Sequence, residues 1–248
     1  MIKFWTLFKH DLYNLISSPG TLSVFLIFPT ILILLMGFLF DNLYHTTIIS
    51  AFDFYSVTMI FFIAMMGVTV PANAFLEKHI KNGNTRIFYS PVSRVSIYSS
   101  KILTCFLFMA LALTINIIIF DMISLVNFGS DKIGYVILLI INFVLFLTIL
   151  SSAICVTLHS EELTNVILSN SMSVLGFLSG IFFPIASLGA IFEKIASFSP
   201  IKWTVDCIFQ LIYDGQSTNY WWIMFALLTL SSLLLLVVHK NYRPEDYI

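Results

Sequence analysis

Residue types that carry out chemistry are few in this chain, and their spacing builds no reactive site. No histidine stands three to five residues from a second convincing ligand, and the cysteines form neither a CxxC nor a Cys/His metal spacing. These residues are His10, His45, His79, His159, His239, Cys105, Cys155 and Cys207. We expect the histidines to be solvated or interfacial and the cysteines to be small packing residues. The pattern predicts no metal ligand and no catalytic residue.

Motifs for nucleotide binding and proton transfer are missing too. No GxxxxGK[ST] P-loop occurs, so this chain is not expected to bind ATP in that way. Ion-coupled carriers usually hold carboxylates inside the membrane, whereas the long apolar runs here offer neutral groups such as Asn116, Asn142 and Asn170. Asp206 and Glu193 lie outside these runs and are expected to face water. An intramembrane protease is disfavoured because no His or Asp falls in the middle of a run.

Composition places the chain in a membrane. Hydrophobic residues make up 59% and charged residues 10%, whereas soluble proteins carry about 25% charged residues to cover their surface. A net charge of −1 offers no basic surface to nucleic acid. A membrane-spanning helix needs about 20 mostly apolar residues, and six runs qualify with no charge in their middle. They are Thr21–Phe40, Phe54–Leu76, Ile102–Phe120, Ile133–Val156, Leu163–Phe183 and Tyr220–Val238.

Lysine and arginine between these runs predict the orientation of the chain, because cytoplasmic loops are enriched in both. With a cytoplasmic N-terminus, nine of the twelve lie inside. Those nine are Lys3, Lys9, Lys78, Lys81, Arg86, Arg94, Lys101, Lys240 and Arg243, against Lys132, Lys194 and Lys202 outside. We therefore expect a multi-pass protein of the cell membrane with both termini in the cytoplasm.

Residues 1–18 are predicted to form an amphipathic helix at the membrane surface. Its apolar residues recur at spacings of three and four, at Ile2, Trp5, Phe8, Leu12 and Ile16. Lys9, Asp11 and Asn14 are expected to point elsewhere, which suits a helix lying in the membrane plane. No cleavage site for a signal peptide follows, and Ser18-Pro19-Gly20 is expected to turn the chain into the first span. A simple anchor and a docking role both fit this helix.

The segment 184–219, before the last span at 220–238, predicts a re-entrant hairpin on the outer side. It is mostly apolar, yet it divides into Ser187–Phe198 and Ile201–Tyr213, each too short to cross. Backbone at membrane depth must satisfy its hydrogen bonds internally, so we expect two short helices. The prediction is an all-α, polytopic protein with a single domain over residues 1–248, in which residues 21–183 hold the first five spans.

The fifth predicted span carries small residues at four-residue spacing. Ser169 with Ser173 and Gly176 with Gly180 form small-xxx-small patterns, which let helix backbones approach closely. Such a stripe predicts either a subunit interface or ordinary packing within the bundle, and both readings remain open.

The cytoplasmic loop, residues 77–101, is where an outside partner could act. It combines charged residues with the apolar Ile87, Phe88 and Tyr89, and it is predicted to hold a short helix that stops before Pro91. A solvated connector would need no aromatic pair. Because the spans hold no internal energy source, the loop predicts a contact with a partner that supplies energy.

In this loop the chain resembles the coupling loop of ABC-2 type permeases, the membrane subunits of one class of ABC exporters. The positions that carry the resemblance are Glu77, Gly83, Thr85, Ser90, Pro91, Arg94 and Lys101. A second similarity covers residues 178–184, with Gly180, Phe182, Phe183 and Pro184, followed by Ser199-Pro200. The order of these motifs along six spans extends the resemblance over nearly the whole chain. One departure is Arg86-Ile87, where the family often has Leu-Glu.

The resemblance implies partners and roles. Two permease subunits, identical or paralogous, would pair around a central path, and separate ABC ATPase subunits would bind ATP and Mg beneath them. The chain itself would be a non-catalytic subunit without a cofactor. The expected ATPase-coupling residues are Glu77, Gly83, Thr85, Arg86, Phe88, Tyr89, Pro91, Arg94 and Lys101. The expected outer gate consists of Gly180, Phe182, Phe183, Pro184 and Pro200.

The substrate class follows from weaker signals. With 25 Phe and nine Met, a path lined by these residues would be apolar and adaptable, which suits an amphipathic peptide toxin, an antimicrobial or a hydrophobic drug. The Ile, Asn and Lys bias resembles low-GC Gram-positive bacteria, so an exporter of amphipathic peptides such as phenol-soluble modulins is one specific candidate. The alternatives are an ion-coupled secondary carrier and a membrane immunity protein without transport.

Overall fold

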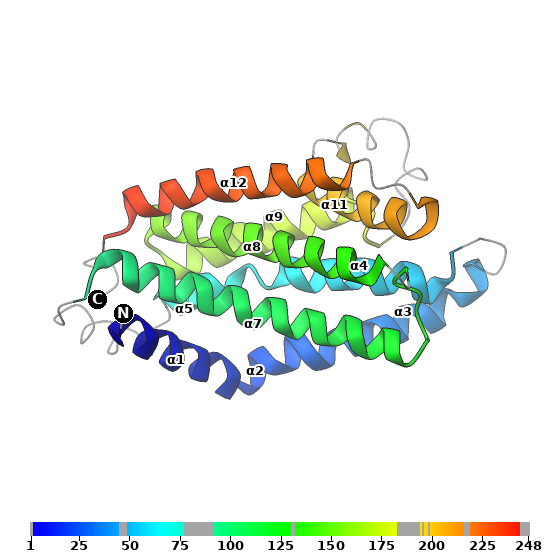
Figure 1. The fold of residues 1–248 in the computed structure, drawn as a ribbon, viewed down its shortest axis with the longest axis horizontal. Coiled ribbons are helices and arrows are strands. Elements are labelled where there is room, and N and C mark those ends of the chain that lie inside the picture. Colours follow the sequence, from blue (N-terminus) through cyan, green and yellow to red (C-terminus); the bar gives the residue numbers. More distant parts are fainter. Residues whose placement is uncertain are drawn as a thin grey trace.

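Every regular element in the described part of the chain is a helix, and the long helices run side by side along one axis (Figure 1). The computed structural model describes residues 2–44, 49–76, 92–129, 132–182, 194, 196–197, 199–215 and 219–243. Its elements are α1 (Ile2–Ser17), α2 (Pro19–Leu22), the π-turn η1 (Ser23–Ile27), α3 (Phe28–Tyr44), α4 (Ala51–Met66), α5 (Thr69–Leu76), α7 (Arg94–Met122), α8 (Ile133–Leu158), α9 (Glu161–Leu178), α11 (Pro200–Phe209), the π-turn η4 (Gln210–Asp214) and α12 (Tyr220–Asn241).

Five helical stretches are long and apolar enough to cross a membrane. They are Pro19–Asn42, Ala51–Leu76, Arg94–Met122, Ile133–Leu158 and Tyr220–Asn241. Each contains one of the predicted spans and extends it, and the stretch Arg94–Met122 begins well before the predicted Ile102, inside the predicted loop. The predicted span Leu163–Phe183 corresponds to α9, which is not among the five.

Helix α9 differs from the others in its polar content. It carries Glu161 and Glu162 in its first turn, and Asn165, Asn170 and several serines along its length. These residues lower its hydropathy, and the helix is only 18 residues long. It ends at Leu178 because Gly180 takes a positive φ of 78°, a conformation that terminates helices and favours glycine.

Side-chain caps explain where several helices begin. Ser50, Ser93 and Ser160 precede α4, α7 and α9, and each accepts a hydrogen bond from the backbone N–H three residues later. This bond satisfies one of the donors that a helix start leaves unpaired. At the other end of α8, His159 takes the left-handed conformation and closes the helix.

Pro29 interrupts the backbone hydrogen bonds of the first span, which stays helical from Pro19 to Tyr44. A proline has no N–H, so the carbonyl of Phe25, four residues earlier, lacks its helical donor. Asn116 of α7 supplies the missing donor, because its Nδ2 lies 2.9 Å from the Phe25 carbonyl oxygen. The Asn116 Oδ1 in turn accepts from Thr30 Oγ1 at 3.3 Å. The carbonyl that Pro29 leaves without a helical donor is thus satisfied by a neighbouring helix.

The second span is broken rather than bent. Helix α4 ends at Met66 and α5 begins at Thr69, so Gly67 and Val68 separate the two. Pro71 lacks the N–H that would reach the Gly67 carbonyl, which instead accepts from Val70 N at 3.0 Å. The Val68 carbonyl accepts a hydrogen bond from Ser151 Oγ of α8. Helix α5 is therefore a short segment that ends directly before the predicted loop.

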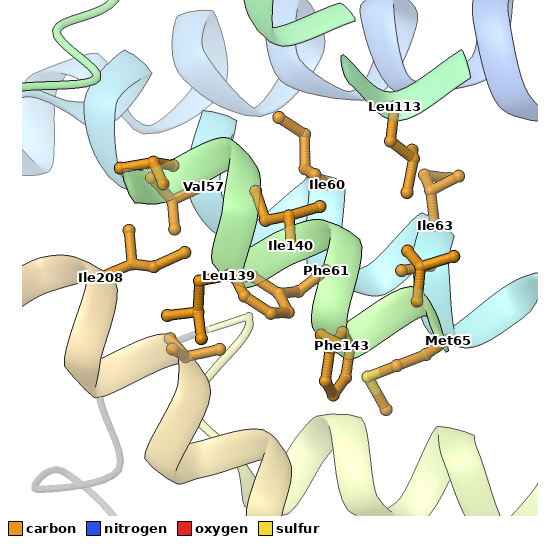
Figure 2. Close-up of a cluster of buried hydrophobic side chains, with 14 of the residues drawn as sticks. Val57, Ile60, Phe61, Ile63, Met65, Leu113, Leu139, Ile140, Phe143 and Ile208 are labelled. Carbon is orange, nitrogen blue, oxygen red and sulfur yellow. The ribbon is translucent and has the colours of Figure 1, made fainter. Parts of the chain in front are cut away.

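The core lies where α4, α7, α8 and α11 meet. Figure 2 shows Phe61 of α4 and Phe143 of α8 facing each other, with Leu113 and Ile208 nearby; the Phe61 and Phe143 rings are 5.0 Å apart. Helix α4 is hydrophobic on all sides, as expected for a helix buried in the middle of a bundle. In the first and last candidate spans, only 22% and 28% of the residues in the most apolar stretch are buried. These two spans therefore lie on the outside of the bundle.

Exposed aromatic residues mark both ends of the bundle. Trp5 and Tyr13 are exposed on α1 at the end where the chain starts and where α12 finishes (Figure 1). At the opposite end the exposed aromatic residues are Tyr135, Trp203, Trp221 and Trp222. Trp and Tyr are enriched at both membrane–water interfaces, and exposed Leu, Ile, Val and Phe side chains occupy the surface in between. The two aromatic layers indicate how the molecule sits in a bilayer.

Candidate functional site

The predicted coupling residues divide between described and undescribed parts of the chain. Those that lie outside the described residues are Glu77, Gly83, Thr85, Arg86, Phe88, Tyr89 and Pro91. Arg94 is exposed in the first turn of α7, and Lys101 lies two turns further along. Helix α5 ends just before the predicted loop, whereas α7 already begins at Arg94, so residues 94–101 of the predicted loop belong to this helix; both helix ends lie at the end of the bundle where α12 finishes (Figure 1).

Lys101 is buried, with 4% of its surface exposed. Its Nζ donates a 2.6 Å hydrogen bond to the carbonyl oxygen of Ala74 and lies 5.8 Å from the centre of the Phe75 ring. Ala74 belongs to the last turn of α5, where carbonyls have no helical donor and where a cation interacts favourably with the helix dipole. Lys101 therefore caps α5 from α7 and ties the two ends of the predicted loop together.

The N-terminal helix is attached to the same place. Ser100 Oγ donates to Asp11 Oδ2 at 3.1 Å, and the Asp11 carboxylate is close enough to interact electrostatically with Lys101. Lys9 and Asn14 are exposed as expected, but Asp11 turns toward α7. Sequence reasoning missed this contact, because Asp11 alone gives no sign of a partner 89 residues away.

An aromatic cluster joins the end of α12 to this site. The Tyr98 hydroxyl of α7 and His239 Nδ1 of α12 form a 2.9 Å hydrogen bond. The Tyr242 ring contacts Tyr98 at 5.4 Å and Phe75 at 6.0 Å between ring centres. Together Asp11, Ser100, Lys101 and these aromatic residues form what we call the loop-base cluster, which connects α1, α5, α7 and α12. The aromatic members were not predicted.

A polar pair holds α5 to α9. Asn165 Nδ2 of α9 donates to Asn73 Oδ1 of α5 at 2.7 Å, while the buried Asn165 Oδ1 has no hydrogen-bond partner among the described residues. Hydrogen bonds between helices are favoured in a membrane because the acyl chains of the lipid offer polar side chains no alternative partner. Helix α5 is thus bound by α7 through Lys101, by α9 through Asn165, and at its break by Ser151 of α8.

The predicted outer gate lies at the opposite end, and part of it is described. Phe182 packs against Phe62 of α4 and Phe177 of α9, with ring centres 5.1 and 4.9 Å apart. Its carbonyl accepts a hydrogen bond from Tyr55 at 3.3 Å. Pro200 starts α11, whereas Phe183 and Pro184 lie outside the described residues. The structure thus brings Phe182 against the last turn of α9 and against a residue of α4 that lies in the middle of the stretch Ala51–Leu76.

The residues that join α9 to α11 complete this end. Ser179, next to the predicted Gly180, lies 3.3 Å from Ser199 between hydroxyl oxygens, and both serines are buried. The second predicted hairpin helix, Ile201–Tyr213, corresponds to α11 with η4, which closes at Gly215 with a φ of 68°. The first hairpin helix falls largely outside the described residues.

The small-residue stripe of α9 points at least partly into the bundle. Gly176 is buried, and a Cβ added there would lie 3.6 Å from Met65 Cε of α4. Ser173 Oγ is bonded to the Ser169 carbonyl of its own helix. The opposite side of α9 is exposed and includes the polar Asn170 and Ser171.

The described residues hold no group of three or more His, Cys, Asp or Glu side chains that could bind a metal. The three cysteines are buried and unpaired. For Cys207 of α11, burial raises the pKa of the thiol to about 11, so the reactive thiolate is scarce at neutral pH.

Two comparisons with known proteins bear on this site. A family model described as "ABC-2 type transporter" matches residues 2–213, which include the loop-base residues up to Lys101 and the predicted gate residues Gly180, Phe182 and Pro200. A search of curated proteins gives no match. The family match carries no substrate, so the specific expectation of a phenol-soluble modulin exporter finds no support in it.

Proposed function

The chain belongs to the ABC-2 type transporter family, and from this premise we propose that it is the permease subunit of an ATP-driven exporter. The observation that carries the proposal is the family match over residues 2–213. Five helical stretches suited to a membrane agree with it. ATP and Mg would be bound and ATP hydrolysed by separate ATPase subunits, which would act on this chain through the loop 77–101.

We place six spans in the membrane, with α9 as the fifth in order. The start of α1 and the end of α12 lie at the same end of the bundle (Figure 1), which requires an even number of crossings. Helix α9 packs along α5 and α8. It would be the sixth crossing, in addition to the five apolar stretches. Both termini would then be cytoplasmic, as the lysine and arginine bias predicts.

The loop-base cluster would transmit a movement of the loop to the helices of the bundle. A push on the loop would act on α5 and α7 together, because Lys101 joins them, and would reach α1 through Ser100 and Asp11. The break at Gly67 and Val68 gives α5 a place to pivot against α4. Lys101 is too buried to touch an ATPase directly, so its role would be to transmit the movement of loop residues such as Phe88 and Tyr89.

A second permease subunit would cover the exposed side of α9. Asn170 and Ser171 are exposed in the middle of this helix, where lipid chains would offer their side chains no hydrogen-bond partner. A polar path between two subunits, identical or paralogous, would offer partners. Phe182 at the outer end of this path would act as part of a gate for a hydrophobic or amphipathic substrate.

The deciding experiment is assembly with an ATPase encoded next to this chain. The chain should co-purify with that ATPase in mild detergent and stimulate its ATP hydrolysis in proteoliposomes. The double substitution Phe88→Ser and Tyr89→Ser should lower the stimulation by at least about tenfold, the effect of losing roughly 1.4 kcal/mol of contact. Lys240→Ser, at the exposed end of α12, is the matched control.

Two results would count against the proposal. The first is failure to bind any ABC ATPase under conditions in which the chain stays folded. The second is transport that continues without ATP but stops with a protonophore, which would favour an ion-coupled carrier.

A further inference from the structure

A cavity lies at the end of the bundle opposite the loop-base cluster, where α8 and α12 both begin. Its volume is about 180 Å³. The residues that line it are Lys132, Tyr135, Leu211, Gly215, Tyr220 and Trp221. None of these belongs to the coupling loop or to the predicted outer gate. The cavity therefore needs an explanation of its own.

Lys132 is held in place on the cavity wall. Its Nζ donates a 3.1 Å hydrogen bond to the Leu211 carbonyl oxygen, near the C-terminal end of the α11–η4 segment. It lies close to Gly215, where an added Cβ would be 3.5 Å from Nζ. An ammonium group has three donors, and the Leu211 bond uses one of them. The described residues include no carboxylate within ion-pair distance of this group.

The aromatic residues of the cavity are also ordered. The Tyr220 hydroxyl donates to the Tyr135 carbonyl oxygen at 3.0 Å, and the two rings meet edge to face at 5.5 Å. Trp221 packs edge-on against Tyr220 at 5.3 Å but is 64% exposed. A hydrogen-bonded cation and an exposed indole thus line the same cavity in the aromatic layer of the molecule.

This layer is where the headgroups of a bilayer lie. Below it, Leu138 of α8 and Phe225 of α12 are exposed and offer an apolar surface for acyl chains. A ligand that fits must bring an anion to Lys132 and hydrocarbon to these side chains. We propose that the cavity binds the phosphate of a phospholipid from the leaflet at this end, with Lys132 donating to a phosphate oxygen and Trp221 packing beside the glycerol.

The proposal needs only that the chain spans a membrane, and its test involves no ATPase. Delipidated protein in detergent is titrated with phosphatidylglycerol, and bound lipids are counted by native mass spectrometry. Lys132→Gln should weaken one binding event by about tenfold, since a hydrogen bond to a charged group contributes an effect of this order. Lys132→Arg should retain the binding, and Trp221→Leu should weaken it while leaving the cation in place.

Lys202→Gln is the matched control, because Lys202 lies on α11 at the same end but is already paired with Asp206 at 2.5 Å. This variant should bind phosphatidylglycerol as the unchanged protein does. Diacylglycerol with the same chains should not fill the site, and inorganic phosphate alone should not displace the lipid at millimolar concentration.

Three outcomes would overturn the proposal. Equal phosphatidylglycerol binding by Lys132→Gln and the unchanged protein would exclude Lys132 as the ligand. Equal binding of diacylglycerol would show that the phosphate is not recognised. Displacement of the lipid by inorganic phosphate would assign the cavity to a free anion instead.

Discussion

At the residue scale, two buried side chains bind backbone carbonyls that the helices leave without a donor. Lys101 reaches the Ala74 carbonyl in the last turn of α5, and Asn116 reaches the Phe25 carbonyl that Pro29 deprives of a partner. Removing one partner of a buried hydrogen bond is more harmful than removing both, because the orphaned group stays buried. This asymmetry allows the Asn116 contact to be tested directly.

Asn116→Ala is expected to lower the free energy of unfolding by about 1–3 kcal/mol, because the Phe25 carbonyl is left buried and unpaired. Pro29→Ala restores a backbone N–H that can donate to this carbonyl. The loss from Asn116→Ala should therefore be smaller in the Pro29→Ala background. Reversible denaturation of the four proteins of this double-mutant cycle in detergent measures the difference.

The control for this cycle is Lys240→Ala, which removes an exposed side chain from the last turn of α12 and should change the free energy of unfolding by no more than about 0.5 kcal/mol. The explanation would be wrong if Asn116→Ala cost the same in both backgrounds.

At the element scale, α5 stands out as a short helix that is broken from α4 and capped from α7. Its eight residues lie between the break at Gly67 and the loop that begins at residue 77. Contacts from α7, α8 and α9 hold it in place. Two changes, one at each end of α5, test whether it behaves as a distinct unit.

Lys101→Met should speed amide hydrogen exchange in residues 69–76 by about tenfold or more. The reason is that the substitution removes a charged donor from the last turn of α5, and a hydrogen bond to a charged group contributes about 1.5–3 kcal/mol. Hydrogen exchange with mass spectrometry on the isolated chain measures the effect. Lys240→Met, an exposed lysine at the same end, should leave these amides unchanged. Unaltered protection of α5 in Lys101→Met would refute the cap.

Gly67→Ala should destabilise the bundle by about 1–3 kcal/mol, the usual effect of overpacking. A Cβ at Gly67 would meet Met109 Cε and the Phe25 ring, so these side chains or α4 itself would have to shift. Thermal unfolding in detergent checks this expectation. Gly134→Ala, where a Cβ would meet nothing within 4 Å, is the matched control and should be close to neutral. If Gly67→Ala left the stability unchanged, the neighbouring side chains would have to move to accommodate the added methyl group.

At the scale of the whole molecule, the number of crossings decides which ends share a side of the membrane. Five stretches are apolar enough to cross, while the bundle places the start of α1 and the end of α12 together (Figure 1). Helix α9 resolves this difference if it crosses despite its polar residues. Its buried side faces α4 and α5, and its exposed side would then face a subunit rather than lipid.

Cysteine labelling of intact cells tests this topology. In a background without the native cysteines, Ser124→Cys should react with a membrane-impermeant maleimide, because Ser124 lies in the exposed turn after α7. Lys9→Cys and Arg243→Cys should react only after the cells are permeabilised. Labelling of residues 9 and 243 from opposite sides would mean an odd number of crossings and would exclude α9 as a span.

The sequence by itself determined the class of protein and the positions of most helices. In lipid, the backbone of a long run without charge satisfies its hydrogen bonds by forming a helix. The five candidate spans could therefore be placed from composition alone. A short-range signal also sufficed where Ser18-Pro19 separates α1 from α2, whereas the start of α7 at Arg94 fell inside the predicted loop. These features depend on neighbours a few residues away, which a sequence displays directly.

Only the tertiary structure decided which polar groups meet. Lys101 looked like a surface residue of a basic loop, yet it lies inside the bundle and binds α5. Asp11 looked solvent-facing, yet it accepts from Ser100, and Lys132 was one of a few outer lysines until its cavity was seen. Each contact joins helices far apart in the chain, and helix periodicity specifies a face without specifying the partner that packs on it. The physical reason is that helix packing, rather than local propensity, brings these groups within hydrogen-bond distance.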